Sequence, residues 1–172
     1  MLSEVGKFFN FLEIGSWNIN GIFQNVGLNK VSKLTDNDFL QQIHNLDIFA
    51  LSETHTGPEQ EISLKNFTSF SSTRTISKNC RYYGGLTVFI KKRIKPGVKL
   101  ISLNNPETIW IKLEKSFFDL EKDIFVAFVY IPPQNSPYLQ KLGTDTYSFP
   151  KFRTRDCHIQ YTGGGILAWR LQ

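Results

Sequence analysis

Five short apolar runs constrain the fold of this 172-residue chain more than any other feature of its sequence. Each run has the length of a β-strand, is rich in Phe, Ile and Val, and is bounded by Gly, Pro, Asn or charged residues. The runs cover residues 11–19, 46–52, 86–90, 109–113 and 124–131. We therefore expect five strands, and we expect the Ser- and Thr-rich residues 68–75 to form a loop.

One amphipathic helix is expected between the first two strands. Asp36 can cap its N-terminus by accepting hydrogen bonds from backbone N–H groups of the first turn. Phe39, Leu40 and Ile43 then fall on one apolar stripe, at positions i, i+1 and i+4. This part of the chain therefore reads strand, helix, strand.

The last two apolar runs predict an antiparallel pair of strands. Lys122 and Asp123 mark a turn between residues 109–113 and residues 124–131. The second of these runs is apolar at every position, as in a strand covered on both faces within a layered sheet. We therefore predict an α/β sandwich rather than an all-β fold. The pattern decays after Pro132, and no regular element is expected beyond about residue 140.

The positive charge of the chain is unevenly distributed. Twenty Lys and Arg against 15 Asp and Glu leave a formal net charge of +5. Residues 151–172 contain four basic residues and a single acidic one, Asp156, and so contribute much of that charge. Net charge is therefore weak support for a nucleic-acid partner.

A denser basic patch follows the third predicted strand. Lys91, Lys92 and Arg93, together with Lys95 and Lys99, fall within nine residues. Such spacing can bind phosphates, so Lys91, Lys92 and Arg93 are candidate nucleic-acid-binding residues. The alternative is a solvated turn after a strand.

Several cellular settings are disfavoured by the sequence. Cys80 and Cys157 are too few and too far apart for a disulfide framework or a zinc site. Residues 1–10 contain no apolar stretch of signal-peptide length, and the longest apolar run is far shorter than the roughly 20 residues of a membrane helix. We expect an intracellular protein, with the nucleus as one location, that is not secreted, binds no membrane and uses no small-molecule cofactor.

Polar side chains follow three of the predicted strands. Asn18 and Asn20 come at the end of the first, Glu53 directly after the second, and Tyr130 at the end of the fifth. Because strand ends lie at the mouth of a sheet, where ligands bind, these side chains are candidate site residues. His55 could face the same mouth, and the favoured alternative for it is a turn histidine. One carboxylate with carbonyl oxygens and waters suits Mg²⁺. The alternative for Glu53 is a helix cap or a turn.

Four sequence strings resemble, in the same order, the motifs of the endonuclease/exonuclease/phosphatase superfamily. Within that superfamily they are most similar to the apurinic-type endonuclease domain of non-LTR retrotransposons. The strings are SWNINGI at residues 16–22, LSETH at 51–55, GGLTVFI at 84–90 and VYIPP at 129–133. Each string is short, and their common order over residues 12–140 makes the resemblance specific.

The resemblance implies a two-sheet sandwich flanked by helices, of the deoxyribonuclease I-like kind. It also implies magnesium-dependent cleavage of a DNA phosphodiester by an activated water, the chemistry of a hydrolase. By resemblance, Asn18 helps to position the scissile phosphate or the catalytic acids, Glu53 binds Mg²⁺, and Tyr130 hydrogen-bonds near the phosphate. Asn20 stands where some relatives have an aspartate near the metal, which makes it a second candidate metal ligand.

The later motifs of the superfamily have no counterpart in the sequence. These are a Gly-Asp-x-Asn turn that orients the nucleophile and a closing Asp-His pair. Asp156-Cys157-His158 brings an Asp and a His together, and we interpret it as a coincidence. We therefore expect residues 1–150 to form a C-terminally incomplete domain, truncated after its first half to two-thirds, with residues 151–172 as a divergent basic tail outside the fold.

These observations lead to one functional expectation and two alternatives. The expectation is a fragment of a magnesium-dependent DNA endonuclease domain of mobile-element origin, with little or no activity, so that its status as an enzyme stays open. One alternative is a non-catalytic nucleic-acid-binding module, in which Tyr82 and Tyr83 could stack on bases or simply pack in the fold. The other is a gene-model fragment without a function.

Overall fold

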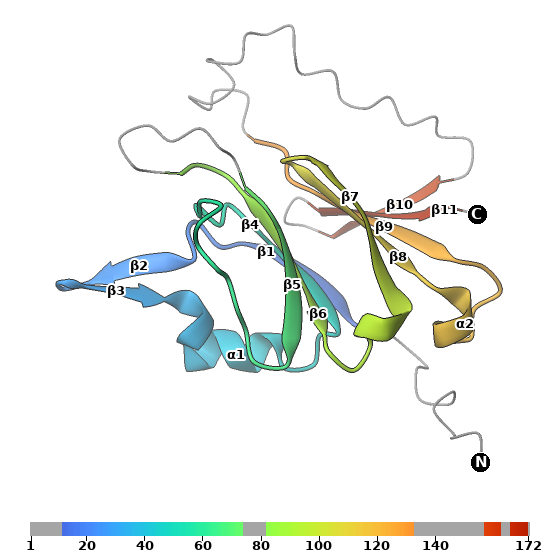
Figure 1. Ribbon diagram of the computed structural model, residues 1–172, viewed down its shortest axis with the longest axis horizontal. Helices are drawn as coiled ribbons and strands as arrows, with labels where there is room; N and C mark the ends of the chain where they lie inside the picture. The colour runs from blue at the N-terminus through green and yellow to red at the C-terminus, as the bar shows by residue number, and fades with distance from the viewer. Residues whose placement is uncertain (1–11, 74–81, 133–156, 163–165, 172) are drawn as a thin grey trace, which may run out of the picture.

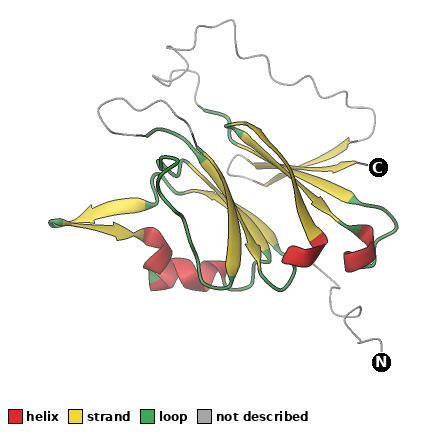
Figure 2. Cartoon of the chain, viewed as in Figure 1, coloured by secondary structure: helices red, strands yellow, loops and turns green. Residues whose placement is uncertain are grey.

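The structure of the protein is a computed structural model that describes residues 12–73, 82–132, 157–162 and 166–171. In these ranges the chain is mixed α/β, built mostly from several sheets with few, short helices. The helical turns lie at one end of the sheets (Figure 2). The coarse prediction of an α/β fold is therefore confirmed.

The first sheet contains four strands in the order β1-β4-β6-β5. Their bounds are Ile14–Asn18 for β1, Ile48–Ser52 for β4, Leu86–Lys91 for β6 and Phe67–Ser72 for β5. β1 runs parallel to β4, whereas β6 is antiparallel to both of its neighbours. The register pairs Asn18 with Ser52, so the carboxyl ends of β1 and β4 coincide.

The second sheet is an antiparallel meander of three strands. β7 covers Val98–Asn105, β8 covers Thr108–Leu113 and β9 covers Ile124–Val129. β8 pairs with β9 in antiparallel fashion, which confirms the predicted pairing of these two strands. The short helix α2, Lys115–Phe118, lies in the connection between them. A 3₁₀ turn at Lys95–Gly97 joins the first sheet to the second.

The main core lies between these two sheets. Ile48 and Ala50 of β4 pack in one cluster with Ile109 and Ile111 of β8 and with Phe128 of β9. All five side chains are fully buried, and burial of apolar surface on this scale is the dominant favourable contribution to folding. The two sheets are thus held face to face by their own apolar side chains (Figure 1).

The opposite face of the first sheet has a second core. Phe49 and Leu51 alternate with the residues that face β8, and they pack with Ile43 of helix α1, Asn37–Ile43. Phe49 stacks on Phe89 with ring centroids 4.7 Å apart. β4 is therefore buried on both faces, which explains why its sequence is apolar at every position before Ser52.

Helix α1 begins where the sequence predicts. The Asp36 carboxylate accepts hydrogen bonds from the N–H groups of Asp38 and Phe39 at 2.9 and 3.0 Å. These two bonds satisfy donors that have no partner within the helix. Ile43 is buried against the sheet, so the predicted cap and apolar stripe are both confirmed.

Two hairpins complete the described structure. β2, Phe23–Val26, pairs with β3, Asn29–Ser32, and this hairpin projects away from the sheets (Figure 1). β10, Cys157–Thr162, pairs with β11, Ile166–Leu171, and β11 lies beside β9. The expectation of no regular element beyond about residue 140 is therefore wrong, whereas the domain division at residue 150 stays a prediction.

The expected loop at residues 68–75 is also corrected. Residues 67–72 form β5 at the edge of the first sheet, paired along its length with β6. An edge strand is held by backbone hydrogen bonds along one side and can carry Ser and Thr at many positions. The part of the expected loop from residue 74 onward lies outside the described residues.

Candidate functional site

The carboxyl ends of β1 and β4 form the edge where three of the predicted site residues lie. Asn18 ends β1, and Glu53 directly follows β4. Backbone hydrogen bonds continue past the strands, from Ile19 N to Ser52 O at 3.0 Å and from Gly21 N to Glu53 O at 2.6 Å. The segment with Asn18 and Asn20 is thus fastened to the segment with Glu53.

The second sheet contributes Tyr130 to this edge. Its hydroxyl donates a hydrogen bond to Oε1 of Glu53 at 2.7 Å, and both residues are half-buried. Tyr130 directly follows β9, and its backbone N–H donates to Glu107 O at 2.9 Å. Two residues predicted from strand ends in different parts of the sequence therefore meet where the two sheets come together.

Asn18 and Asn20 form a tight local turn. The backbone N–H of Asn20 donates to Oδ1 of Asn18 at 3.0 Å, and both side chains are exposed. Asn20 adopts a left-handed backbone with φ 46°, and the next residue, Gly21, has φ 86°. Asn18 therefore shapes the loop that holds Asn20 beside Glu53, with its side-chain oxygen used in that role.

The same edge concentrates unusual backbone conformations. Of the five non-glycine residues with positive φ in the described chain, Asn20, Glu53 and His55 lie here. A left-handed conformation at a non-glycine residue costs roughly 1–3 kcal/mol and persists only where the surroundings hold it. Such residues gather at functional sites more often than elsewhere in folded proteins.

Gly85 is part of the structure that keeps Glu53 and His55 in their left-handed conformations. The N–H groups of Thr54 and His55 donate to the carbonyls of Gly85 and Gly84 at 3.4 and 2.8 Å. Gly85 has φ 92°, and a Cβ at this position would overlap with Oγ1 of Thr54. The glycine pair of the GGLTVFI string is therefore explained by its left-handed backbone, with φ 70° at Gly84, and by the close approach of Thr54 to Gly85.

The side chains at this edge offer a sparse set of metal ligands. Glu53 supplies a carboxylate, and Asn20 can supply an amide oxygen. Within the described ranges, the structure contains no cluster of three or more His, Cys, Asp or Glu side chains. The donor set fits Mg²⁺, which commonly keeps several waters and is held by one or two carboxylates together with substrate phosphate.

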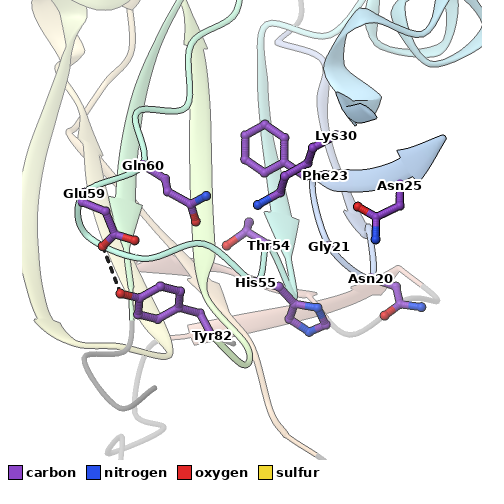
Figure 3. A pocket seen from close by; sticks show the side chains of 10 residues that line it. All are labelled: Asn20, Gly21, Phe23, Asn25, Lys30, Thr54, His55, Glu59, Gln60 and Tyr82. Carbon is purple, nitrogen blue, oxygen red and sulfur yellow. Dashed lines mark hydrogen bonds between the residues drawn. The ribbon is translucent and has the colours of Figure 1, made fainter. Parts of the chain in front are cut away.

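A polar cleft of about 530 Å³ is lined in part by Thr54 and His55, the two residues that follow Glu53. Thr54 and His55 lie between its two sides, the β2–β3 hairpin and the loop of residues 56–60 with Tyr82 (Figure 3). This cleft is not predictable from the sequence, because its walls come from three separate segments. The signal that could have found the hairpin is Gly27-Leu28 between Val26 and Asn29, since Gly at the first central position favours a type II′ turn.

The basic patch lies at the other end of the first sheet. Lys91 and Arg93 both pair with Oδ1 of Asp47, whose side chain is only 4% exposed, with Lys91 Nζ at 3.5 Å. Asp47 precedes β4 and Glu53 follows it, so a strand of five residues, about 17 Å long, separates the patch from the site. The structure therefore does not bring Lys91, Lys92 and Arg93 together with Glu53.

A third charged cluster surrounds the turn after β8. Asp123 accepts hydrogen bonds from Lys115 N at 2.9 Å and Lys112 Nζ at 3.0 Å, and these bonds lower the pKa of its carboxyl below the usual value. Lys99 bonds Glu114 at 2.6 Å and lowers the pKa of Glu114. The Lys112 pKa is raised, chiefly by Asp123. This cluster stabilises the β8–α2–β9 connection.

Comparisons with known proteins leave the resemblance as an expectation. No protein-family model matches the sequence, and no curated protein matches it. In the described part of the chain, no helix is both long enough and apolar enough to cross a membrane.

Proposed function

We propose that the edge with Glu53 and Tyr130 is the magnesium- and phosphate-binding part of a DNA phosphodiester endonuclease site. The proposal includes the finer fold, a deoxyribonuclease I-like sandwich of two sheets flanked by helices, of the kind found in non-LTR retrotransposons. The observation that carries it is the 2.7 Å hydrogen bond from the Tyr130 hydroxyl to Glu53. A half-buried carboxylate held in one orientation at a sheet edge is suited to hold a hydrated divalent cation.

Each residue has a distinct part in this proposal. Glu53 holds Mg²⁺, which when bound stabilises negative charge on phosphoryl oxygens. Tyr130 orients the Glu53 carboxylate and presents a hydroxyl next to the phosphate. Asn18 fixes the turn that carries Asn20, through its 3.0 Å hydrogen bond, and Asn20 offers a second oxygen to the cation. Fixed polar groups of this kind need no reorganisation during the reaction.

We further propose that the chain has little or no cleavage activity. Hydrolysis needs a group that takes a proton from the attacking water, and positioned acid–base groups contribute about 10²–10⁴ in rate. The Gly-Asp-x-Asn and Asp-His motifs that perform this task in the superfamily are not found in the sequence. Catalytic groups that work as a unit lose most of their effect together when one is removed.

A plasmid-nicking assay with Mg²⁺ tests the activity. Wild-type protein and Glu53→Ala are expected to nick supercoiled DNA at the same background rate. Glu121→Ala serves as a matched control, because Glu121 is an exposed glutamate in the turn before β9. Cleavage that Glu53→Ala abolishes and Glu121→Ala retains would contradict the proposed inactivity while supporting the site.

Nucleic-acid binding without cleavage is the second candidate function. The observation in its favour is a cleft of about 830 Å³ between α1 and β5 that is lined by Lys65, Lys91, Lys92 and Arg93. Asp47 neutralises only part of this positive charge. Binding at this cleft would rest on phosphate contacts and would weaken steeply with salt.

A further inference from the structure

We propose that the polar cleft beside Glu53 binds one unstacked nucleobase of the DNA strand whose phosphate lies at Glu53. This inference rests on the proposed function and adds a substrate class to it, DNA with an unpaired base. The cleft has a volume of about 530 Å³, within the range of about 300–1,000 Å³ typical of small-molecule sites.

The two sides of the cleft offer complementary chemistry (Figure 3). The hairpin side presents Phe23, Asn25 and Lys30, and the loop side presents Gln60 and Tyr82. Amide side chains carry both donors and acceptors, which is what the edge of a nucleobase requires. Aromatic rings bind the face of any base. The cleft therefore has groups for both the edge and the face of a base.

The electrostatics of the cleft favour a base over a free phosphate. Lys30 Nζ lies over the Phe23 ring, 4.9 Å from its centroid. On the loop side, Glu59 accepts a hydrogen bond from the Tyr82 hydroxyl at 3.0 Å. One cation and one carboxylate balance each other, so the cleft as a whole does not select an anion. A neutral, polar and aromatic ligand suits this balance.

Tyr82 is positioned by the glycine below it. A Cβ at Gly57 would overlap with the Tyr82 ring, so the absence of a side chain at Gly57 lets the ring lie against the backbone. The Gly57 contact lies at the ring carbon that carries the hydroxyl, and that hydroxyl donates the hydrogen bond to Glu59. A ring fixed by these two contacts is a prepared stacking surface, because part of its side-chain freedom is already lost before binding.

The cleft is joined directly to the proposed phosphate site. Asn20 and Gly21 line it, and Gly21 N donates to Glu53 O at 2.6 Å. Thr54 and His55, which follow Glu53 in sequence, lie between its sides. A nucleotide with its phosphate at Glu53 therefore has its base within reach of the cleft. Enzymes that take a base out of the stack pay a few kcal/mol, least for a base that is already unpaired.

Binding of a bulged duplex in EDTA tests the inference. The probe is a short DNA duplex with one unpaired 2-aminopurine, compared with the same duplex fully paired. Wild-type protein is expected to bind the bulged duplex about tenfold more tightly and to change its 2-aminopurine emission. Tyr82→Ala is expected to weaken binding of the bulged duplex by about 5- to 150-fold, the range for loss of base–aromatic stacking. Tyr82→Phe keeps the ring and is expected to keep the preference.

A second pair of variants covers the case in which Tyr82→Ala does not fold. Asn25 lines the cleft and Asn29 does not, and both are exposed asparagines of the same hairpin. Asn25→Ala is expected to reduce the preference for the bulged duplex several-fold, and Asn29→Ala is expected to leave it unchanged.

Three results would overturn the inference. These are no binding of either duplex, equal binding of both, or a preference that survives both Tyr82→Ala and Asn25→Ala. Because EDTA removes divalent cations, this experiment measures DNA binding at the cleft independently of the metal. A failure of the magnesium site would therefore appear only in the metal-dependent measurements.

Discussion

The Tyr130 hydroxyl donates a 2.7 Å hydrogen bond to the carboxylate of Glu53, 77 residues away in the sequence. One residue follows β9 of the second sheet and the other follows β4 of the first. The bond therefore depends on the two sheets packing face to face through their shared core. It links the candidate site directly to the correct assembly of the fold.

Tyr130→Phe is expected to lower the free energy of unfolding by about 1–2 kcal/mol. The substitution removes a hydrogen bond to a carboxylate, a type of bond that contributes about 1.5–3 kcal/mol, less the part that water can replace at a half-buried site. Urea denaturation of both proteins measures the difference. A wild-type stability in Tyr130→Phe would show that the bond does not hold the two sheets at this edge.

Gly85→Ala is expected to destabilise the protein more than Gly27→Ala does. Both glycines have positive φ, 92° at Gly85 and 61° at Gly27, which costs alanine about 1–2 kcal/mol. A Cβ at Gly85 would also overlap with Thr54, whereas a Cβ at Gly27 meets no atom within 4 Å. Thermal or urea unfolding of the two variants gives the comparison. Equal effects would contradict the close approach of Thr54 to Gly85.

The cluster around Asp123 predicts a loss of stability in acid. Hydrogen bonds from Lys115 and Lys112 lower the pKa of Asp123 in the folded state below its ordinary value of 3.8. Its carboxylate therefore stabilises the fold above about pH 4, and this contribution disappears as the pH falls through the lowered pKa. The stability difference between wild type and Asp123→Asn should shrink steadily below about pH 4.

Urea midpoints measured across this acid range check the prediction. Glu121→Gln is the matched control, since Glu121 is an exposed acidic residue of the same turn. Its difference from wild type should stay constant over the same pH range. A difference for Asp123→Asn that grows toward low pH would have the wrong sign for this account.

The basic patch predicts different effects for two neighbouring residues. Arg93→Ala is expected to cost roughly 1–3 kcal/mol of stability, because it removes a charge partner from the buried Asp47 and leaves Lys91 as the remaining cation. Lys92→Ala is expected to leave stability within about 0.5 kcal/mol of wild type, since the Lys92 side chain is exposed. Its backbone N–H bond to Asn66 does not depend on the side chain.

DNA affinity as a function of salt separates the roles of these residues. If the patch binds phosphate, Lys92→Ala should reduce the slope of log K against log salt by about 0.9. An unchanged slope would assign Lys92 to the solvated turn that is the alternative interpretation of this segment. Urea unfolding of Arg93→Ala and Lys92→Ala supplies the accompanying stability values.

Much of the framework was predictable because local sequence and burial agree. The five apolar runs are strands, with boundaries shifted by a few residues, since a strand buried by its neighbours must be apolar. Asp36 caps α1 because its carboxylate reaches two N–H groups of the next turn. The placement of Glu53 and Tyr130 at the sheet edge was predictable because each directly follows such a strand.

Other elements of the fold have little signal in their local sequence. β5 has Ser or Thr at four of its six positions and is held by pairing with β6 rather than by an apolar pattern. The β2–β3 hairpin exposes Val26 and Leu28, so its strands lack the alternation of a half-buried sheet. Lys33 directly follows the hairpin, and its Nζ donates to Ile19 O of the site loop at 2.7 Å, a contact that only the three-dimensional structure shows.

The basic patch shows why spacing alone misleads. Lys91, Lys92 and Arg93 are consecutive, which suggests one shared role in the sequence. In the structure, Lys91 and Arg93 pair with Asp47, a residue more than 40 positions earlier, while Lys92 is exposed. A buried acidic partner contributed by a distant segment leaves no mark on the local pattern of charges.

Magnesium-dependent binding of DNA by wild type and Glu53→Gln tests the central claim most directly. Divalent cations normally weaken protein–DNA binding by competing for phosphate. At constant ionic strength, the account predicts that Mg²⁺ tightens wild-type binding of a short duplex about tenfold and does not tighten binding by Glu53→Gln, as measured by fluorescence anisotropy. Magnesium that weakens binding equally in both proteins would contradict the account.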